Sequence, residues 1–252
     1  MCMIKKENKY ILKAQRKKFI KKLLIIFLFF VMAVVLFITK SNFFIVKKVA
    51  ITGNPIITGD DVKKRCERII GENIFFVKKD DLIKEAKKNP YVDEVKVSKQ
   101  YPKQININIV EKEGIYYVNQ GKSKFILNNK LILLEKTDDI QGRNLVEVTG
   151  IDFQESEIGN TVLEDYRIRN ILEDFYNVVK NNPTGYNVSC IDIKDLTDIK
   201  VYIGDIEGRL GNDENILDKM NKILHIVSNP ETGITKGYID VSFDGSPIYY
   251  KE

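Results

Sequence analysis

The most distinctive hydrophobic pattern in the chain is an unbroken apolar run at residues 23–38, closed by lysines at both ends. A helix of this length spans about 24 Å, and Thr39 with the flexible lysine stems can cover the rest of a hydrocarbon core of about 30 Å. A soluble helix buries only one stripe of its surface. The run therefore predicts a transmembrane helix over residues 23–39 instead of a buried core helix.

The charge of the first 22 residues predicts the orientation of this helix. Nine Lys and Arg residues stand there against one acid, Glu7, so the segment carries +8. Cytoplasmic flanks of membrane helices are rich in Lys and Arg, so we expect residues 1–22 to be a cytoplasmic tail and the chain after Lys40 to be extracytoplasmic. Subtracting the tail from the total of +5 leaves −3 for residues 23–252. The basic pI therefore gives no argument for a nucleic-acid partner.

A cleaved signal peptide is the alternative to a retained anchor. Residues 39–44, which follow the run, lack an A-x-A-like site of small residues. We therefore expect an uncleaved signal anchor and a single-pass membrane protein.

The next segment predicts the order strand, helix, helix, strand, strand. Thr58 with an acid three residues later is typical of a capping box, which would start the first helix. The last strand has strict period two, with Ile105, Ile107 and Ile109 on one face and asparagines between them. The expected elements are strand 45–51, helix 58–70, helix 80–89, strand 95–97 and strand 105–109. Both helices would cover one face of a three-stranded sheet.

Residues 113–252 predict a second domain of strands with two amphipathic helices. Apolar positions recur at helical spacing in 163–179 and 216–227; the first helix would stop at Asn182-Pro183 and the second would be capped near Asn212-Asp213. Strands are expected at 115–118, 124–127, 131–134, 145–148, 188–193, 199–203, 206–210, 238–243 and 248–250. The expected fold class is α+β, with a mixed or antiparallel sheet in this domain.

Catalytic and ligand-binding motifs are absent from the sequence. His225 is the one histidine and lies beside apolar residues of the last helix, so a surface or packed residue is expected. The acid pairs at 60–61 and 80–81 stand at helix starts, where they complement the helix dipole. No zinc-ligand spacing, nucleophile motif or G-x-G-x-x-G loop occurs. We expect no catalytic, cofactor or metal site and no small-molecule substrate.

The three cysteines do not form a disulfide framework. Cys2 lies in the basic tail, while Cys66 and Cys190 occupy apolar positions in different domains. A disulfide between the latter two is one interpretation, and two buried thiols are the favoured one.

Three motifs follow the apolar run: FIVKKVAITGN at 44–54, NPYVDEVKV at 89–97 and YPKQININIVEK at 101–112. They resemble the POTRA domain of the FtsQ/DivIB family of bacterial cell-division proteins, whose signature includes P-x-x-(I/L)-x-I-x-V-x-E. Stretches at 201–211 and 237–241 resemble its β domain. The resemblance implies a cytoplasmic tail at 1–22, an anchor at 23–39, a POTRA domain at 43–112 and a β domain at 113–252.

The resemblance also implies a non-enzymatic scaffold at the division septum that helps to organise septal peptidoglycan synthesis. Its partners would be FtsB/DivIC-like and FtsL-like bitopic division proteins, one of which adds a β-strand near the last strands of the β domain. In strand 238–243 the alternation places Ile239, Val241 and Phe243 on one face, which fits a sheet buried on one side; an ordinary internal strand is the alternative. The expected partner-binding residues are Tyr238, Asp240, Ser242, Phe243, Tyr249 and Tyr250.

A second function class carries a POTRA domain as well. A membrane protein that assists secretion or assembly could use a sheet edge to bind clients by strand addition. Repeated POTRA units or a barrel would favour that class, and the sequence predicts neither. A cell-wall enzyme is the third alternative.

Overall fold

The computed structural model describes residues 4–53, 55–151 and 156–252, with side chains described from residue 12 onward. Cys2 lies outside the described residues, as do the side chains of the basic residues at 5, 6 and 9. The chain divides into two compact units, Met1–Val110 and Glu111–Glu252, and each is described by itself.

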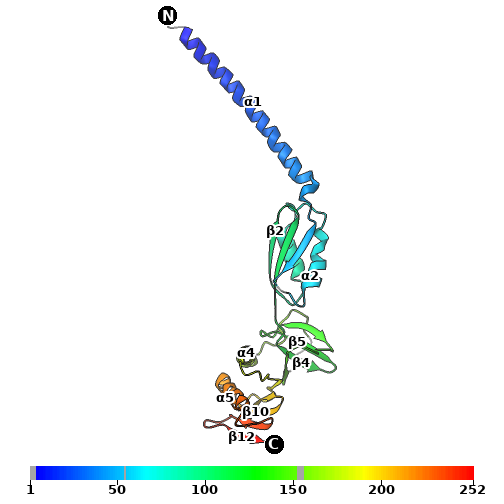
Figure 1. The fold of residues 1–252 in the computed structure, drawn as a ribbon, viewed down its shortest axis with the longest axis vertical. Helices are drawn as coiled ribbons and strands as arrows, with labels where there is room; N and C mark the ends of the chain where they lie inside the picture. The colour runs from blue at the N-terminus through cyan, green and yellow to red at the C-terminus, as the bar shows by residue number, and fades with distance from the viewer. Residues whose placement is uncertain (1–3, 54, 152–155) are drawn as a thin grey trace. The chain divides into compact units, whose positions relative to one another are not determined.

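The first unit begins with one long helix, α1, Ile4–Lys40 (Figure 1). It starts well before the expected span because the basic tail continues the same helix. Its part Leu12–Lys40 is long and apolar enough to cross a membrane. The apolar side chains at 23–37 are exposed on all sides, an arrangement suited to lipid and not to water.

After α1 the first unit has the expected order of elements, which confirms its α+β class. The elements are β1 Lys48–Thr52, α2 Gly59–Cys66, α3 Lys79–Ala86, β2 Val92–Gln100 and β3 Gln104–Glu111, with short 3₁₀ turns at Asn42–Phe44 and Glu67–Ile69. The strand order is β1-β3-β2, with β1 parallel to β3. Ile105, Ile107 and Ile109 of β3 are fully buried in one cluster with Leu82 of α3 and Val62 of α2.

The predicted capping box at Thr58 is wrong. Thr58 is the residue before α2, but it is fully buried and its side chain makes no capping hydrogen bond. Asp61, the acid of the expected box, instead accepts hydrogen bonds from Arg65 Nε at 2.9 Å and Asn89 Nδ2 at 2.8 Å. These two donors, Arg65 first, lower the pKa of Asp61. The carboxylate thus ties α2 to the segment after α3.

The second unit is a mixed sheet with two helices. Among the described residues the sheet has nine strands in the order β12-β11-β10-β9-β8-β7-β4-β5-β6. The strands are β4 Tyr116–Gln120, β5 Ser123–Leu127, β6 Leu133–Thr137, β7 Val146–Thr149, β8 Cys190–Asp192, β9 Ile199–Ile203, β10 Asp205–Gly211, β11 Lys236–Asp240 and β12 Ile248–Lys251; the helices are α4 Tyr166–Asn181 and α5 Ile216–Ser228.

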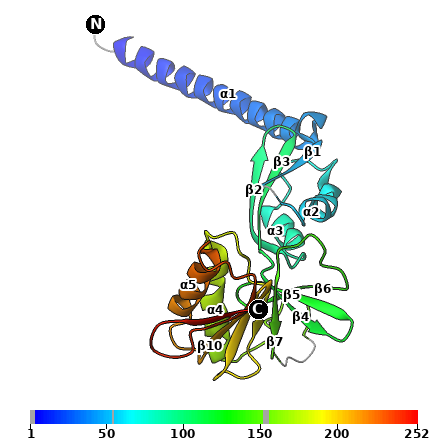
Figure 2. The ribbon, with the colours of Figure 1, turned by 60° about the horizontal axis from the view of Figure 1, so that its bottom comes forward.

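Both helices pack on the same face of this sheet (Figure 2). Phe175 of α4 and Ile223 of α5 are fully buried in one core with Val201 of β9 and Ile239 of β11. The neighbouring strands β10 and β11 run parallel, and α5 is the crossover connection that a parallel pair needs. Along β10 and β11 the other face of the sheet carries polar and aromatic side chains, among them Glu207, Arg209 and Tyr238.

The start of α5 differs from the expected cap near Asn212-Asp213. The helix begins at Ile216, after Asn215 in a left-handed conformation with φ of 53° and without a side-chain cap. Asp213 instead forms a two-pronged ion pair with Arg167 of α4, with Nε–Oδ2 at 2.8 Å and Nη2–Oδ1 at 2.9 Å. Asp213 therefore binds a side chain of α4 and does not cap α5.

Candidate functional site

The two last strands form one end of the large sheet. β11 pairs with β10 on one side and with β12 on the other, so its backbone is paired within the chain on both edges. β12 has no further strand beyond it among the described residues, and all four of its residues are exposed. Of the two interpretations of strand 238–243, the pairing shows the ordinary internal strand for β11. The edge is β12.

The pairing register of β12 decides which of its backbone groups point outward. Glu252 N–H donates to Lys236 O at 3.0 Å, so Glu252 faces β11. In an antiparallel pair the inward-facing residues alternate with outward-facing ones, so Ile248 and Tyr250 also face β11. The N–H and C=O groups of Tyr249 and Lys251 then point away from the sheet, where a further strand can pair with them.

Tyr238 and Tyr250 lie on the face of the sheet opposite the helices. They are directly opposite each other in the register, and their rings stack with centroids 5.8 Å apart. The Arg209 guanidinium lies 4.0 Å from the centre of the Tyr238 ring, a cation–π contact, and its Nε donates to Glu207 at 2.6 Å. The exposed Tyr250 ring thus extends an aromatic and charged surface to the edge of the sheet.

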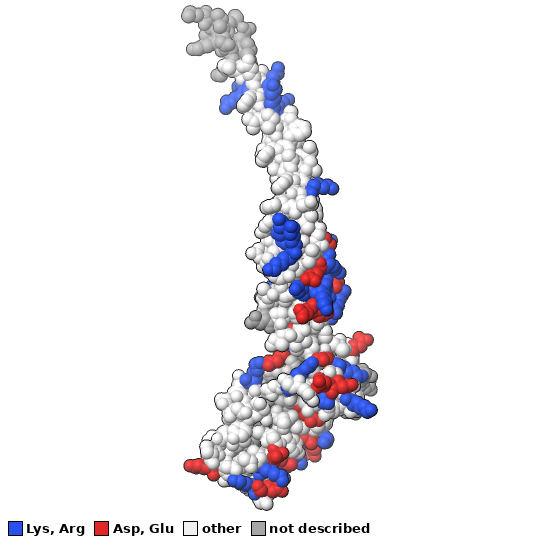
Figure 3. Space-filling view, turned by 45° about the vertical axis from the view of Figure 1, so that its right-hand side comes forward, with Lys and Arg blue, Asp and Glu red and all other residues white. Residues whose placement is uncertain are grey.

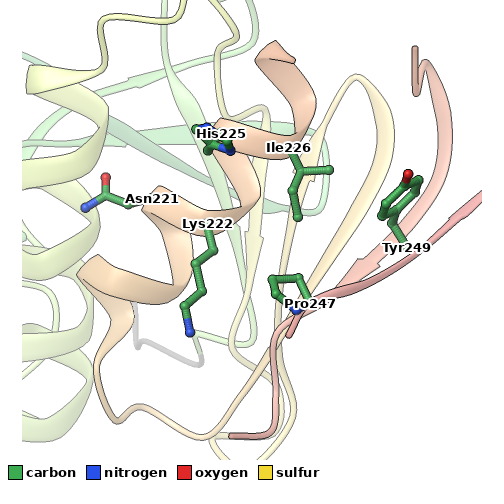
Figure 4. A pocket seen from close by; sticks show the side chains of 6 residues that line it. All are labelled: Asn221, Lys222, His225, Ile226, Pro247 and Tyr249. Carbon is green, nitrogen blue, oxygen red and sulfur yellow. The ribbon is translucent and has the colours of Figure 1, made fainter. Parts of the chain in front are cut away.

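Tyr249 lies on the opposite, helix-covered face, because it pairs with the buried Ile239. Beside it an open pocket of about 460 Å³ lies between α5 and β12, as Figure 4 shows. Its lining residues are Asn221, Lys222, His225, Ile226, Pro247 and Tyr249. His225 is exposed, as expected, and the lining contains neither a carboxylate nor a nucleophilic hydroxyl of Ser or Thr. The pocket combines the apolar side chains of Ile226 and Pro247 with the polar ends of Lys222, His225 and Tyr249.

The turn after β11 explains where the sequence pattern misplaces Phe243. Asp240 Oδ1 accepts hydrogen bonds from Ser242 N–H at 3.0 Å and from Ser242 Oγ–H at 2.7 Å, which ends the strand. Val241 is the last buried residue, and Phe243 is 42 % exposed. Phe243 is thus not on the buried face that alternation predicts. Asp240 and Ser242 shape the turn and do not offer a free edge.

The structure therefore brings four of the six predicted residues into two groups: Tyr238 with Tyr250, and Asp240 with Ser242. Phe243 lies in the loop between the strands, and Tyr249 faces α5. Sequence reasoning missed Lys251 and the lining of the pocket from α5. Period two from Tyr249 would have indicated Lys251, whereas the α5 side chains approach β12 only in the folded sheet.

Other candidate chemistry gives no competing site. Within the described parts of the chain no group of three or more His, Cys, Asp or Glu side chains could hold a metal ion. Cys66 and Cys190 are free thiols, and burial raises the pKa of each to about 11. A nucleophile needs the thiolate, so both fit a packing role.

Comparison with known families agrees with this architecture. Residues 44–112 match the family described as "POTRA domain, FtsQ-type". Together with α1, this match defines a protein with an N-terminal membrane-spanning helix followed by an FtsQ-type POTRA domain.

Curated relatives extend the similarity over nearly the whole chain. The cell division protein DivIB of Clostridium botulinum (strain Loch Maree) is 33 % identical over 97 % of this chain and 96 % of its own length. Those of Clostridium acetobutylicum and Listeria monocytogenes are 29 % and 24 % identical over 98 % and 91 % of this chain and 98 % and 82 % of their own lengths. The chain belongs to the DivIB/FtsQ family of cell division proteins, which confirms the resemblance. The family is structural and not enzymatic, and membership implies partners among division proteins.

Proposed function

We propose that this protein is a bitopic scaffold of the division septum that receives a β-strand from a partner at the outer edge of β12. The partner is an FtsB/DivIC-like bitopic protein, with an FtsL-like protein in the same complex, and the assembly organises septal peptidoglycan synthesis. The single observation that supports the site best is the free edge itself, with outward backbone groups at Tyr249 and Lys251. The exposed aromatic rings of Phe243 and Tyr250 supply the residue type that dominates interface energetics.

The edge proposal predicts a large effect from one backbone donor. Lys251→Pro removes an outward N–H without removing a bond to β11, so the fold should persist while partner binding weakens by about 2 kcal/mol or more, roughly thirtyfold. Phe243→Ala should weaken binding by a similar amount, because an exposed aromatic ring is truncated. The measurement is a titration of the purified full-length chain with a peptide from the partner's extracytoplasmic end.

The matched control for the proline variant is Lys251→Ala, which removes the same side chain and keeps the N–H. Its affinity should stay near that of the wild type. Circular dichroism melting of all three variants verifies that they are folded. If Lys251→Pro and Phe243→Ala are folded and bind as tightly as the wild type, the partner docks elsewhere.

The scaffold also requires residues 41–252 to lie outside the cytoplasm with α1 retained as an anchor. The basic tail before the apolar run supports this orientation. Protease added to intact, wall-stripped cells should digest residues 41–252 and leave the tail protected. A protease-resistant C-terminal unit in intact cells, or a mature chain that begins near Ser41, would contradict the proposed topology.

A further inference from the structure

A cluster of aromatic rings lies where the first unit meets the end of α1. Phe37 of α1 packs edge-on against Phe44 with centroids 5.9 Å apart, and Phe44 packs against Phe43 and Phe75, each at 5.1 Å. Phe75 in turn lies 5.0 Å from Tyr101 in the turn between β2 and β3. The rings form a continuous path from the membrane-spanning helix onto the POTRA domain.

Hydrogen bonds fix this end of the domain beside the helix. Asn73 Nδ2 donates to Ile38 O at 2.7 Å, and Asn73 Oδ1 accepts from Phe75 N–H at 3.0 Å. One side chain thus links the last turn of α1 to the segment that carries Phe75 and Phe76. α1 is long and apolar enough to cross a membrane up to Lys40, which would place this end of the domain at the membrane surface.

The aromatic side chains at this end are too exposed to belong to a core. Phe43 is 50 % exposed, Phe76 64 % and Tyr101 54 %. The POTRA core is complete without them, since its buried cluster is formed by aliphatic side chains and Cys66. Grouped large apolar side chains on a surface mark a contact with another phase or another molecule.

Lysines accompany these rings. Lys103 Nζ lies 5.2 Å from the centre of the Phe43 ring, and Lys99 Nζ donates to Phe75 O at 3.3 Å. Burial, and then the neighbouring charge of Lys79, lowers the pKa of Lys99. Glu72 is the one acidic residue in the segment 70–78 that carries Phe75 and Phe76. Figure 3 shows Lys and Arg atoms on the visible surface of this unit near the helix, with Asp and Glu atoms interspersed along one side.

We propose that Phe43, Phe75, Phe76 and Tyr101, with Lys99 and Lys103, form a juxtamembrane surface that rests in the headgroup layer of an anionic bilayer. Tyrosine is enriched at membrane–water interfaces, and exposed Phe rings can insert into the boundary between headgroups and acyl chains. Lysines beside them attract anionic lipid headgroups. A bilayer is the occupant the structure favours, because the surface continues directly from the membrane-spanning helix. The inference is independent of the strand-addition site and gives the POTRA domain a fixed position against the membrane.

Fluorescence gives a direct test, because the chain contains no tryptophan. Phe76→Trp places a reporter on the juxtamembrane surface. Val110→Trp is the matched control, because Val110 is also exposed. It lies six residues along β3 from Gln104, the strand residue next to Lys103, and is therefore about 20 Å from that end of the strand. Each full-length variant is reconstituted in vesicles of phosphatidylglycerol and phosphatidylcholine that contain brominated lipid.

Brominated lipid should quench Phe76→Trp severalfold more strongly than Val110→Trp, and its emission should be blue-shifted. Tyr101→Trp serves as a second reporter if Phe76→Trp does not fold. Adding Lys99→Gln and Lys103→Gln should reduce the quenching, as should replacing phosphatidylglycerol with phosphatidylcholine. Equal quenching of surface and control reporters would overturn the proposal, and so would a surface reporter shielded only after another division protein is added.

Discussion

Gly237→Ala should separate the last two strands and destabilise the second unit by about 3 kcal/mol or more. Gly237 has φ of 127°, and a Cβ built on it would lie 2.0 Å from the backbone O of Tyr250. That oxygen belongs to β12, so no side-chain rotation can relieve the clash. β12 must move away from β11, and the outward edge at Tyr249 and Lys251 is lost with it. Urea unfolding of the purified chain, followed by circular dichroism, measures the loss.

Gly245→Ala is the matched control for this variant. Gly245 also has a positive φ, 145°, but its Cβ would meet only the Phe243 ring, at 3.7 Å, an ordinary contact distance. Both variants therefore carry backbone strain, and only Gly237→Ala carries the clash. Equal losses of stability in the two variants would mean that the close pairing of β11 and β12 is not what Gly237 provides.

Ile107→Ala should destabilise the POTRA domain by about 2–5 kcal/mol, the sum of lost transfer free energy and the cavity left behind. Ile107 is fully buried in the centre of β3, between Ile105 and Ile109. Its neighbour Asn108 is on the other face and only half-buried, with one long hydrogen bond of 3.4 Å to Thr52 Oγ1. Asn108→Ala should therefore change the unfolding free energy by no more than about 0.5 kcal/mol.

Thermal unfolding of the two variants side by side tests which face of β3 is buried, because they change adjacent residues of one strand. A large loss for Ile107→Ala with a small one for Asn108→Ala supports the register of the sheet. Similar melting shifts for both would mean that the faces of β3 are assigned wrongly.

The sequence predicts the POTRA core well because its pattern is local. The alternation of Ile105, Ile107 and Ile109 is enough to assign the buried face, and Pro102 marks the turn before it. The pairing of β1 with β3, by contrast, joins Lys48 to Gln104 across more than fifty residues. Short-range periodicity contains no information about such a pairing, so the sequence pattern predicts three strands without their order in the sheet.

The predictions that failed depend on competition between local and long-range contacts. Thr58 has the sequence of a cap, but burial of its side chain removes it from that role, and Asp61 is drawn to Arg65 and Asn89. Asp213 likewise leaves the predicted cap for Arg167 of α4. Phe243 continues an apolar alternation, but the hydrogen bonds from Ser242 to Asp240 end the strand first.

In the candidate site, too, the local pattern is predictable from the sequence and the long-range pairing is not. The sequence indicates the aromatic residues of the last two strands, yet it cannot tell which strand is the edge. That depends on β12 folding back along β11, so that Tyr250 stacks on Tyr238 and leaves Tyr249 and Lys251 facing outward. The expected partner residues Tyr238 and Asp240 then support the edge from the strand behind it.

The most direct test of strand addition is amide hydrogen exchange, resolved to single residues, in the free full-length chain and in its complex with the partner peptide. Tyr250 N–H faces β11 and should be protected in both states. The amides of Tyr249 and Lys251 should exchange rapidly in the free chain and become protected in the complex, because the added strand accepts their hydrogen bonds. If the peptide is bound and both amides still exchange as in the free chain, the partner does not pair with β12 and the central proposal is wrong.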